Sequence, residues 1–147
     1  VLPDGDGINS RSKGGIRMNL QEIQEIFRGD RFASEMGAEI LEAEQGRARC
    51  ALTIGPGHRN AAGGVMGGVL FTLADFAFAV AANYSRMNTV SLGSQIAYLS
   101  GVKGERIFAE AVCVKAGRST CYYTVDITDD LGTRVAQVTT TGFIRNG

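Results

Sequence analysis

One acidic side chain, Asp75, interrupts a long apolar segment of this chain. The segment 67–83 reads GGVLFTLADFAFAVAAN, and Asp75 stands between Ala74 and Phe76. Burying an unpaired carboxylate in such surroundings is expensive. Two interpretations stay open: a structural aspartate with a hydrogen-bond partner or an exposed edge, and a reactive acid whose pKa is tuned by its surroundings. A reactive carboxylate attacks an activated carbonyl or draws a proton from water.

Two glycines, Gly67 and Gly68, open the same segment. At the start of a helix their N–H groups would lie uncovered at the positive end of the dipole, where they suit an oxygen that gains negative charge. A plain tight entry turn is the alternative. Asn60, in the preceding loop GPGHRNAAGG, also fits a turn, and Ser91 also fits an exposed surface position.

The residue types that bind metals are scarce and scattered. The chain has one histidine and three cysteines, and no two cysteines form a CxxC pair. A zinc site would need improvised ligands, so we expect no metal and no cofactor. We expect the thiols of Cys50, Cys113 and Cys121 to be small buried groups.

The elements that must position these side chains follow from hydrophobic periodicity. Apolar residues at helical spacing predict a short amphipathic helix over about 20–29 with Asn19 as its N-cap. Alternation over 47–54 predicts a half-buried strand, and 67–83 predicts a helix that is buried all round. Four further strands are expected at 89–99, 105–116, 119–128 and 134–144. Their short connections predict that consecutive strands pair as antiparallel hairpins.

Length and charge narrow the classes of function. The chain has 147 residues, enough for one domain, and its 15 basic and 15 acidic side chains cancel. Nucleic acid and anionic membranes are therefore unfavoured partners. No secretory hydrophobic region is recognisable and no apolar run reaches the roughly 20 residues that span a bilayer. A reducing cytoplasm is therefore the expected location. We expect residues 1–17 to be a flexible tail and 18–147 to be the folded domain.

Taken in order, the candidate residues resemble a family motif. Its members here are Asn60, Met66, Gly67, Gly68 and Asp75. Their spacing, N-x(5)-M-G-G-x(6)-D, is similar to N-x(5)-H-G-G-x(6)-D in PaaI-like (phenylacetate-pathway) thioesterases of the hotdog-fold superfamily. The runs LADFAFAVAAN, IAYLS and RVAQVTTTGF continue the resemblance, which covers about 18–143.

The resemblance implies an α+β hotdog fold, in which a curved antiparallel sheet wraps around one long central helix. It implies a homodimer, often a dimer of dimers, that hydrolyses an acyl-CoA to a free acid and CoA. Aryl and short- to medium-chain acyl groups are the candidates, and the sequence leaves the acyl group open, with a long chain as the alternative. Asp75 would be the nucleophile or general base, Gly67 N–H and Asn60 would hold the carbonyl, and Ser91 would place the attacking water. Substrate and CoA contacts would involve Met66, Gly68, Val90, Gly117 and Arg118. Arg59, Lys103 and Lys115 are further candidates for the CoA phosphates.

The spacing of Gly67 and Asp75 predicts that two subunits share each site. The two residues are eight positions apart, which is about 12 Å along one helix at roughly 1.5 Å per residue. One thioester carbonyl cannot easily reach both groups of the same chain. A C2 dimer, in which Gly67 of one subunit faces Asp75 of the other, removes the difficulty and creates two sites.

Met66 departs from the family motif, because histidine is usual at that position. A thioether is a poor acceptor and has no proton to give. His58 is expected to be a solvated loop residue, with a role as substitute for the missing histidine as the alternative. A non-catalytic protein that binds acyl-CoA or lipid is the alternative to the thioesterase. A hotdog dehydratase is less favoured, because that chemistry relies on a histidine and His58 is badly placed.

Overall fold

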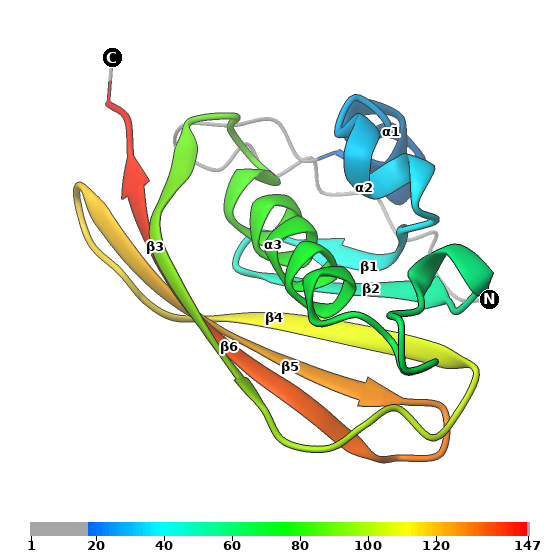
Figure 1. The fold of residues 1–147 in the computed structure, drawn as a ribbon. Helices are drawn as coiled ribbons and strands as arrows, with labels where there is room; N and C mark the ends of the chain where they lie inside the picture. Colours follow the sequence, from blue (N-terminus) through cyan, green and yellow to red (C-terminus); the bar gives the residue numbers. More distant parts are fainter. Residues whose placement is uncertain (1–17, 147) are drawn as a thin grey trace, which may run out of the picture.

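The computed structural model describes residues 18–146, where a curved antiparallel sheet surrounds a long helix (Figure 1). The strands are β1 (Glu39–Glu44), β2 (Arg47–Thr53), β3 (Thr89–Tyr98), β4 (Arg106–Ala116), β5 (Thr120–Asp129) and β6 (Arg134–Ile144). The helical elements are α1 (Leu20–Phe27), α2 (Arg31–Glu35), the 3-10 turn η1 (Pro56–His58) and α3 (Gly67–Asn83). The predicted α+β architecture is confirmed. The tail expected at 1–17 lies outside the described residues.

The strand order corrects one prediction about pairing. The sheet runs β1-β2-β4-β5-β6-β3, and all its neighbours are antiparallel. The pairs β4–β5 and β5–β6 are the expected hairpins, but β3 pairs with β6 rather than with β4. Three inter-strand steps of about 4.8 Å separate β4 from β3. The connection 99–105 spans that distance easily at roughly 3.3 Å per residue, so its shortness did not require a hairpin.

Helix α3 lies inside the curve of the sheet and packs mainly against β2 and β4 (Figure 1). Its buried residues are Val69, Leu70, Leu73, Ala74, Phe76, Ala77, Phe78, Val80, Ala81, Ala82 and Asn83. The expectation that it is buried all round is wrong for the single chain. Between its ends, Gly68, Phe71, Thr72, Asp75 and Ala79 are not buried. Their i, i+3, i+4 spacing places them on one face, which we call the open stripe of α3.

Two short helices precede the sheet, and only the first was predicted. Asn19 caps α1, because its Oδ1 accepts from the N–H of Glu22 at 2.8 Å while the Glu22 carboxylate accepts from Asn19 N–H. Helix α2 has five residues, too few for a 3.6-residue period to show in the sequence. It contacts α3 and thereby forms one wall beside Asp75.

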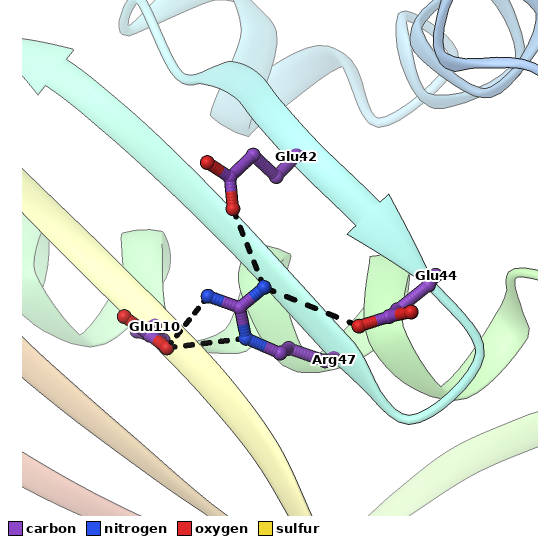
Figure 2. Close-up of polar contacts among 4 residues, drawn as sticks. All are labelled: Glu42, Glu44, Arg47 and Glu110. Atoms are coloured by element: carbon purple, nitrogen blue, oxygen red, sulfur yellow. Dashed lines mark hydrogen bonds and ion pairs between the residues drawn. The ribbon is translucent and has the colours of Figure 1, made fainter.

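The outer face of the sheet carries a charged group centred on Arg47 of β2 (Figure 2). Its guanidinium donates to Glu110 of β4 at 3.0 and 3.2 Å and to Glu42 of β1 at 3.3 Å, and it lies 4.0 Å from Glu44. We call these four residues the Arg47 cluster. The Arg47 side chain is 41% exposed, so the cluster links three strands within reach of water.

None of the helices in 18–146 combines the length and hydrophobicity needed to cross a membrane.

Candidate active site

Asp75 lies at the centre of the open stripe of α3. The residue is exposed in the single chain, and its side chain helps line a hollow of about 230 Å³ between α2 and α3. No side chain or backbone group within 18–146 forms a hydrogen bond with its carboxylate. Desolvation, and then the nearby charge of Asp30, raise the pKa of Asp75. A carboxylate without donors and with a raised pKa is a stronger base than an ordinary surface aspartate.

The first residues of α3 present uncovered N–H groups, as helix starts do. Met66 is the N-cap and forms no side-chain cap. The first closed bond runs from Val69 N–H to the Met66 carbonyl at 3.0 Å, which leaves the N–H groups of Gly67 and Gly68 outside the helical ladder. A Cβ on Gly67 would lie 2.6 Å from the Tyr98 hydroxyl. Glycine is therefore the residue that fits under Tyr98 without displacing it.

Asn60 folds the loop in front of α3. Its Oδ1 accepts from the N–H groups of Ala62 at 3.0 Å and Gly64 at 3.1 Å, and its own N–H donates to the Gly64 carbonyl. This is the turn-forming role that the sequence left open. The amide Nδ2 has no acceptor among the described residues. Asn60 and Gly67 line one hollow of about 710 Å³, so the structure brings these two predicted donors together.

His58 is not the solvated loop residue that was expected. Its Nδ1 accepts from Gly55 N–H at 2.9 Å, so Nε2 carries the proton and donates to the Met36 carbonyl at 2.7 Å. Its carbonyl accepts from Met66 N–H at 2.9 Å. Both ring nitrogens are therefore engaged in holding the loop before α3. Over 18–146, no three His, Cys, Asp or Glu side chains gather as metal ligands, and the expected absence of a cofactor stays a prediction.

Strand β3 runs antiparallel to α3 and carries Val90 and Ser91 at its start. Asn83, at the end of α3, bonds both backbone groups of Thr89 at 2.8 and 3.1 Å, whereas Tyr98 at the other end of β3 covers Gly67. Seven residues, or roughly 23 Å of strand, separate Ser91 from Tyr98. Within one chain Ser91 is consequently remote from Gly67, although both Val90 and Ser91 are exposed.

The remaining predicted contacts are on the surface. Met66 is 56% exposed beside the start of α3. Gly117 and Arg118 form the exposed β4–β5 turn, where Gly117 N–H donates to the Thr120 carbonyl and the Arg118 carbonyl accepts from Asn146. Neither lies in the hollows that contain Asp75 or Gly67. Arg59 does line the Gly67 hollow, with its guanidinium bonded to the Gly63 carbonyl at 2.9 Å.

Three residues near the candidate site were missed by sequence reasoning. Asp30 and Phe32 line the Asp75 hollow from α2, and Tyr98 covers Gly67 from β3. Asp30 and Phe32 come close to Asp75 only through the packing of α2 on α3, which no periodicity reveals. Tyr98 belongs to the IAYLS run that the sequence singled out, but its position over Gly67 depends on the path of β3.

Comparisons with known proteins find similarity to thioesterases. The sequence model of the thioesterase superfamily matches residues 62–136. The acyl-coenzyme A thioesterase PaaI of Escherichia coli K12 is 29% identical over 117 residues, which are 79% of this chain and 84% of that protein.

Two solved structures are also similar. One is a mutant of the phenylacetic acid degradation protein PaaI from Thermus thermophilus, at 33% identity and TM-score 0.74, covering 79% of this chain and 100% of that chain. The other is a hypothetical thioesterase protein with coenzyme A from Streptococcus pneumoniae, at 28% identity and TM-score 0.71, covering 82% of this chain and 97% of that chain.

Proposed function

We propose that this chain, which belongs to the thioesterase superfamily, hydrolyses acyl-CoA thioesters to a free carboxylic acid and CoA. The predicted hotdog fold is confirmed by the sheet that wraps α3 and by this membership. The observation that carries the proposal is Asp75, a carboxylate on the open stripe of the central helix that has no hydrogen-bond donor among residues 18–146. The similarity to a protein named acyl-coenzyme A thioesterase and to a structure with coenzyme A supports the substrate class.

The proposed reaction uses the two features of α3. The ionised Asp75 attacks the thioester carbonyl carbon or takes a proton from the water that attacks it. The carbonyl oxygen gains negative charge and accepts from Gly67 N–H, with Asn60 Nδ2 as a second donor. These donors belong to a second copy of the chain, because Gly67 and Asp75 of one chain lie about 12 Å apart along α3. The C–S bond then breaks and the CoA thiolate leaves. Where water attacks, its oxygen becomes part of the acid, and the proton taken by Asp75 passes to the thiolate. Where Asp75 attacks, the acyl group forms a mixed anhydride with it, which water cleaves to the acid and the free Asp75 carboxylate while the thiolate takes up the released proton.

We propose that a C2 homodimer completes each site. Within the described part of the chain, nothing covers the open stripe of α3 and no strand pairs with the outer edge of β3, so both support binding of a second copy. Along β3, Val90 is 41% and Leu92 is 64% exposed, although long apolar edge strands are normally covered. Antiparallel packing of two α3 helices would enclose Asp75 and place Gly67 of the partner subunit opposite it. Exposed Val112 and Val114 on β4 support a dimer of dimers through a second surface.

The hydrolysis is tested with a panel of aryl and straight-chain acyl-CoAs. We expect turnover by the wild type, and a loss of about 10²-fold or more in kcat for Asp75→Asn, the size of a general-base or nucleophile contribution. Asp126→Asn removes the same charge from the exposed face of β5 and should retain wild-type rates. If wild type and Asp75→Asn are equally slow with every thioester while CoA esters still bind, the protein binds acyl-CoA without hydrolysing it. That is the alternative suggested by Met66, which stands where the family usually has histidine.

The shared site is tested by mixing two inactive variants. Gly67→Pro removes one N–H, and Met66 already has φ −63° and ψ 135°, a conformation that residues before proline adopt. The proline Cβ requires the Tyr98 ring to move, so Gly67→Ala, which keeps the N–H and adds the same Cβ, is the matched control and should retain more activity. Equal mixing with Asp75→Asn should restore about a quarter of wild-type activity, since half of the dimers then hold one intact site of two. No rescue after demonstrated subunit exchange would contradict the shared site.

We also propose a reducing cytoplasm as the location. The thiols of Cys50, Cys113 and Cys121 are free, which supports a compartment that keeps cysteines reduced. Burial of the thiols is confirmed for Cys50 and Cys121, whereas Cys113 is only partly buried.

A further inference from the structure

We propose that His58 is a positioning residue for the hydrolysis, because its ring holds the loop 55–66 so that Gly67 N–H and Asn60 Nδ2 point at one carbonyl oxygen. The side chain itself touches no reacting atom and transfers no proton. This inference rests on the proposed function, since it takes those two groups as the donors to the carbonyl oxygen. It gives a role in the reaction to the one histidine of the sequence.

The loop 55–66 has few other anchors. None of its side chains is buried, and the side-chain hydrogen bonds of Arg59 and Asn60 close within the loop itself. Among the residues that the structure describes, His58 alone in this loop has a side chain that bonds a residue outside it, through Nε2 and the Met36 carbonyl at 2.7 Å. Exposed loops without packed side chains are normally the mobile parts of a fold. This one bond therefore carries much of the task of fixing the loop.

The ring ties residue 58 to two neighbouring elements. Nδ1 accepts from Gly55 N–H at 2.9 Å, just after β2, and Nε2 donates to the Met36 carbonyl at the end of α2. Helix α2 has a support that does not involve His58, because Ser34 Oγ donates to the Phe27 carbonyl at 3.2 Å. A planar ring that is bonded at both nitrogens cannot rotate without losing a bond. The backbone of residue 58 is consequently fixed relative to β2 and α2 together.

Backbone hydrogen bonds pass the position of residue 58 on to both donors. The His58 carbonyl accepts from Met66 N–H at 2.9 Å, and Met66 directly precedes Gly67. On the facing side of the loop, Asn60 N–H donates to the Gly64 carbonyl at 2.7 Å. A displacement of residue 58 would therefore move both donors. A misplacement of about 1 Å at an active site costs up to about 10²-fold in rate.

The same bonds argue against proton transfer by His58. The single proton of the neutral ring is on Nε2 and is donated to a backbone carbonyl, while the lone pair of Nδ1 accepts from Gly55 N–H. Neither nitrogen is free to take a proton from water or to give one to the leaving thiolate. The ring also lines neither the hollow at Gly67 nor the hollow at Asp75.

The first experiment measures kcat and KM for three His58 variants on the acyl-CoA panel above. His58→Leu removes both ring bonds, and kcat should fall about 10- to 100-fold while KM changes less than about threefold, because the donors act on charge that develops in the transition state. His58→Asn can still accept from Gly55 N–H, and His58→Gln can still donate to the Met36 carbonyl. Each should recover part of the loss. If both are as slow as His58→Leu, the ring does more than hold the loop and the proposal is overturned.

Gln24→Leu is the matched control for a loss of stability. Gln24 Nε2 donates to the Ile40 carbonyl at 2.9 Å, which is also a partly buried bond from a side chain to the backbone of a neighbouring element. The variant should leave kcat unchanged. A loss of kcat as large as that of His58→Leu would mean that any weakened contact between elements slows the reaction, and it would overturn the specific role of His58.

The second experiment asks which half of the shared site His58 supports. His58→Leu should impair the half with Gly67 and leave Asp75 of the same chain intact. Equal mixing with Asp75→Asn should therefore restore about a quarter of wild-type activity, since half of the dimers then hold one intact site of two. Mixing with Gly67→Pro should restore nothing beyond the residual rate of His58→Leu. Rescue by Gly67→Pro, or no rescue by Asp75→Asn after demonstrated subunit exchange, would overturn the assignment.

Failure of this inference is distinguishable from failure of the proposed function. If the wild type hydrolyses none of the esters, the proposed hydrolysis is overturned and the role of His58 falls with it. If the wild type is active and Asp75→Asn rescues Gly67→Pro, but His58→Leu keeps the wild-type kcat, the loop is held without the ring. In that case this inference alone is overturned.

Discussion

Asp75 and Asp129 are the same side chain placed in opposite environments. Asp129, at the end of β5, is 3% exposed and accepts four backbone N–H groups. The donors are those of Lys103, Gly104, Leu131 and Thr133, at 2.8 to 3.0 Å. Desolvation by burial acts to raise the pKa of Asp129, but these hydrogen bonds outweigh it and hold the pKa far below the usual range. Asp75 has no donors within 18–146, and desolvation followed by the charge of Asp30 raises its pKa.

The difference shows what separates a structural carboxylate from a reactive one. Every acceptor position of Asp129 is used to join the β3–β4 connection to the β5–β6 turn, so its charge stabilises the fold. The oxygens of Asp75 stay available, and its ionised form is less favoured in the folded chain than in the unfolded one. The variants below test whether backbone hydrogen-bond donors and burial are what distinguish Asp129 from Asp75.

The largest expected effect is the loss of activity in Asp75→Asn, accompanied by a gain in stability. A raised pKa in the folded state means that ionisation of Asp75 at neutral pH opposes folding. The neutral amide removes that penalty, so kcat should fall about 10²-fold or more while Tm at pH 7 rises. Calorimetry and steady-state rates on one preparation measure both. A Tm below that of the wild type would show that Asp75 stabilises the fold and would remove the contrast with Asp129.

Asp129→Asn should have the opposite outcome, with Tm lowered by several degrees. The amide nitrogen of asparagine cannot accept, so two of the four backbone N–H groups lose their acceptor and the charge is lost as well. Because the folded pKa is lowered, the contribution of Asp129 is complete above the ordinary carboxyl range and is lost as pH falls through the folded pKa. The difference in Tm between wild type and variant should therefore narrow in acid. Asp126→Asn is the matched control on the same strand. A difference that stays constant down to low pH would contradict the role of the charge.

Asp30→Asn should have a smaller effect, visible in the pH profile. The charge of Asp30 contributes to the raised pKa of Asp75, and the other ionisable group in their hollow, Arg31, is paired with Glu35. Removing the Asp30 charge should lower the pKa of Asp75, so the acid limb of kcat/KM should move to lower pH. If Asp30 has only a structural role, Asp30→Asn will change kcat/KM without shifting the pH at which the acid limb of the profile falls. The profile is measured with butanoyl-CoA at constant ionic strength.

The sequence predicted Asp75 more readily than Asp129 for a physical reason. Asp75 is conspicuous because its neighbours along the helix are apolar, and the boundaries of α3 were predicted from the same run. Asp129 stands in the polar run DDLGT, and two of its donors come from residues 103 and 104. Only the folded arrangement of the two connections identifies it.

The other wrong predictions from the sequence also concern features that only the tertiary structure determines. The pairing of β3 with β6 is set by the sheet order, which local connections do not encode. His58 looked like a solvated loop residue, but its ring bonds a carbonyl 22 residues earlier, at Met36. The open stripe of α3 looked like core, because a face that the single chain leaves uncovered has the same apolar composition as a buried one.

The smallest expected effect is on the Arg47 cluster, whose side chains make many polar contacts but are largely exposed. A substitution there tests whether the number of polar contacts or their burial determines how much a charge stabilises the fold. Arg47 donates three hydrogen bonds and has three carboxylates within 4.0 Å, almost as many contacts as Asp129. Its side chain and that of Glu110 are 41% and 43% exposed, however, so water replaces much of what a substitution removes. Arg47→Gln should therefore lower Tm far less than Asp129→Asn, and the small effect should diminish further at high salt. Thermal melts of both variants at low and high ionic strength measure this. Equal losses of Tm in the two variants would mean that the count of polar contacts, rather than burial and backbone donors, determines which charges stabilise this fold.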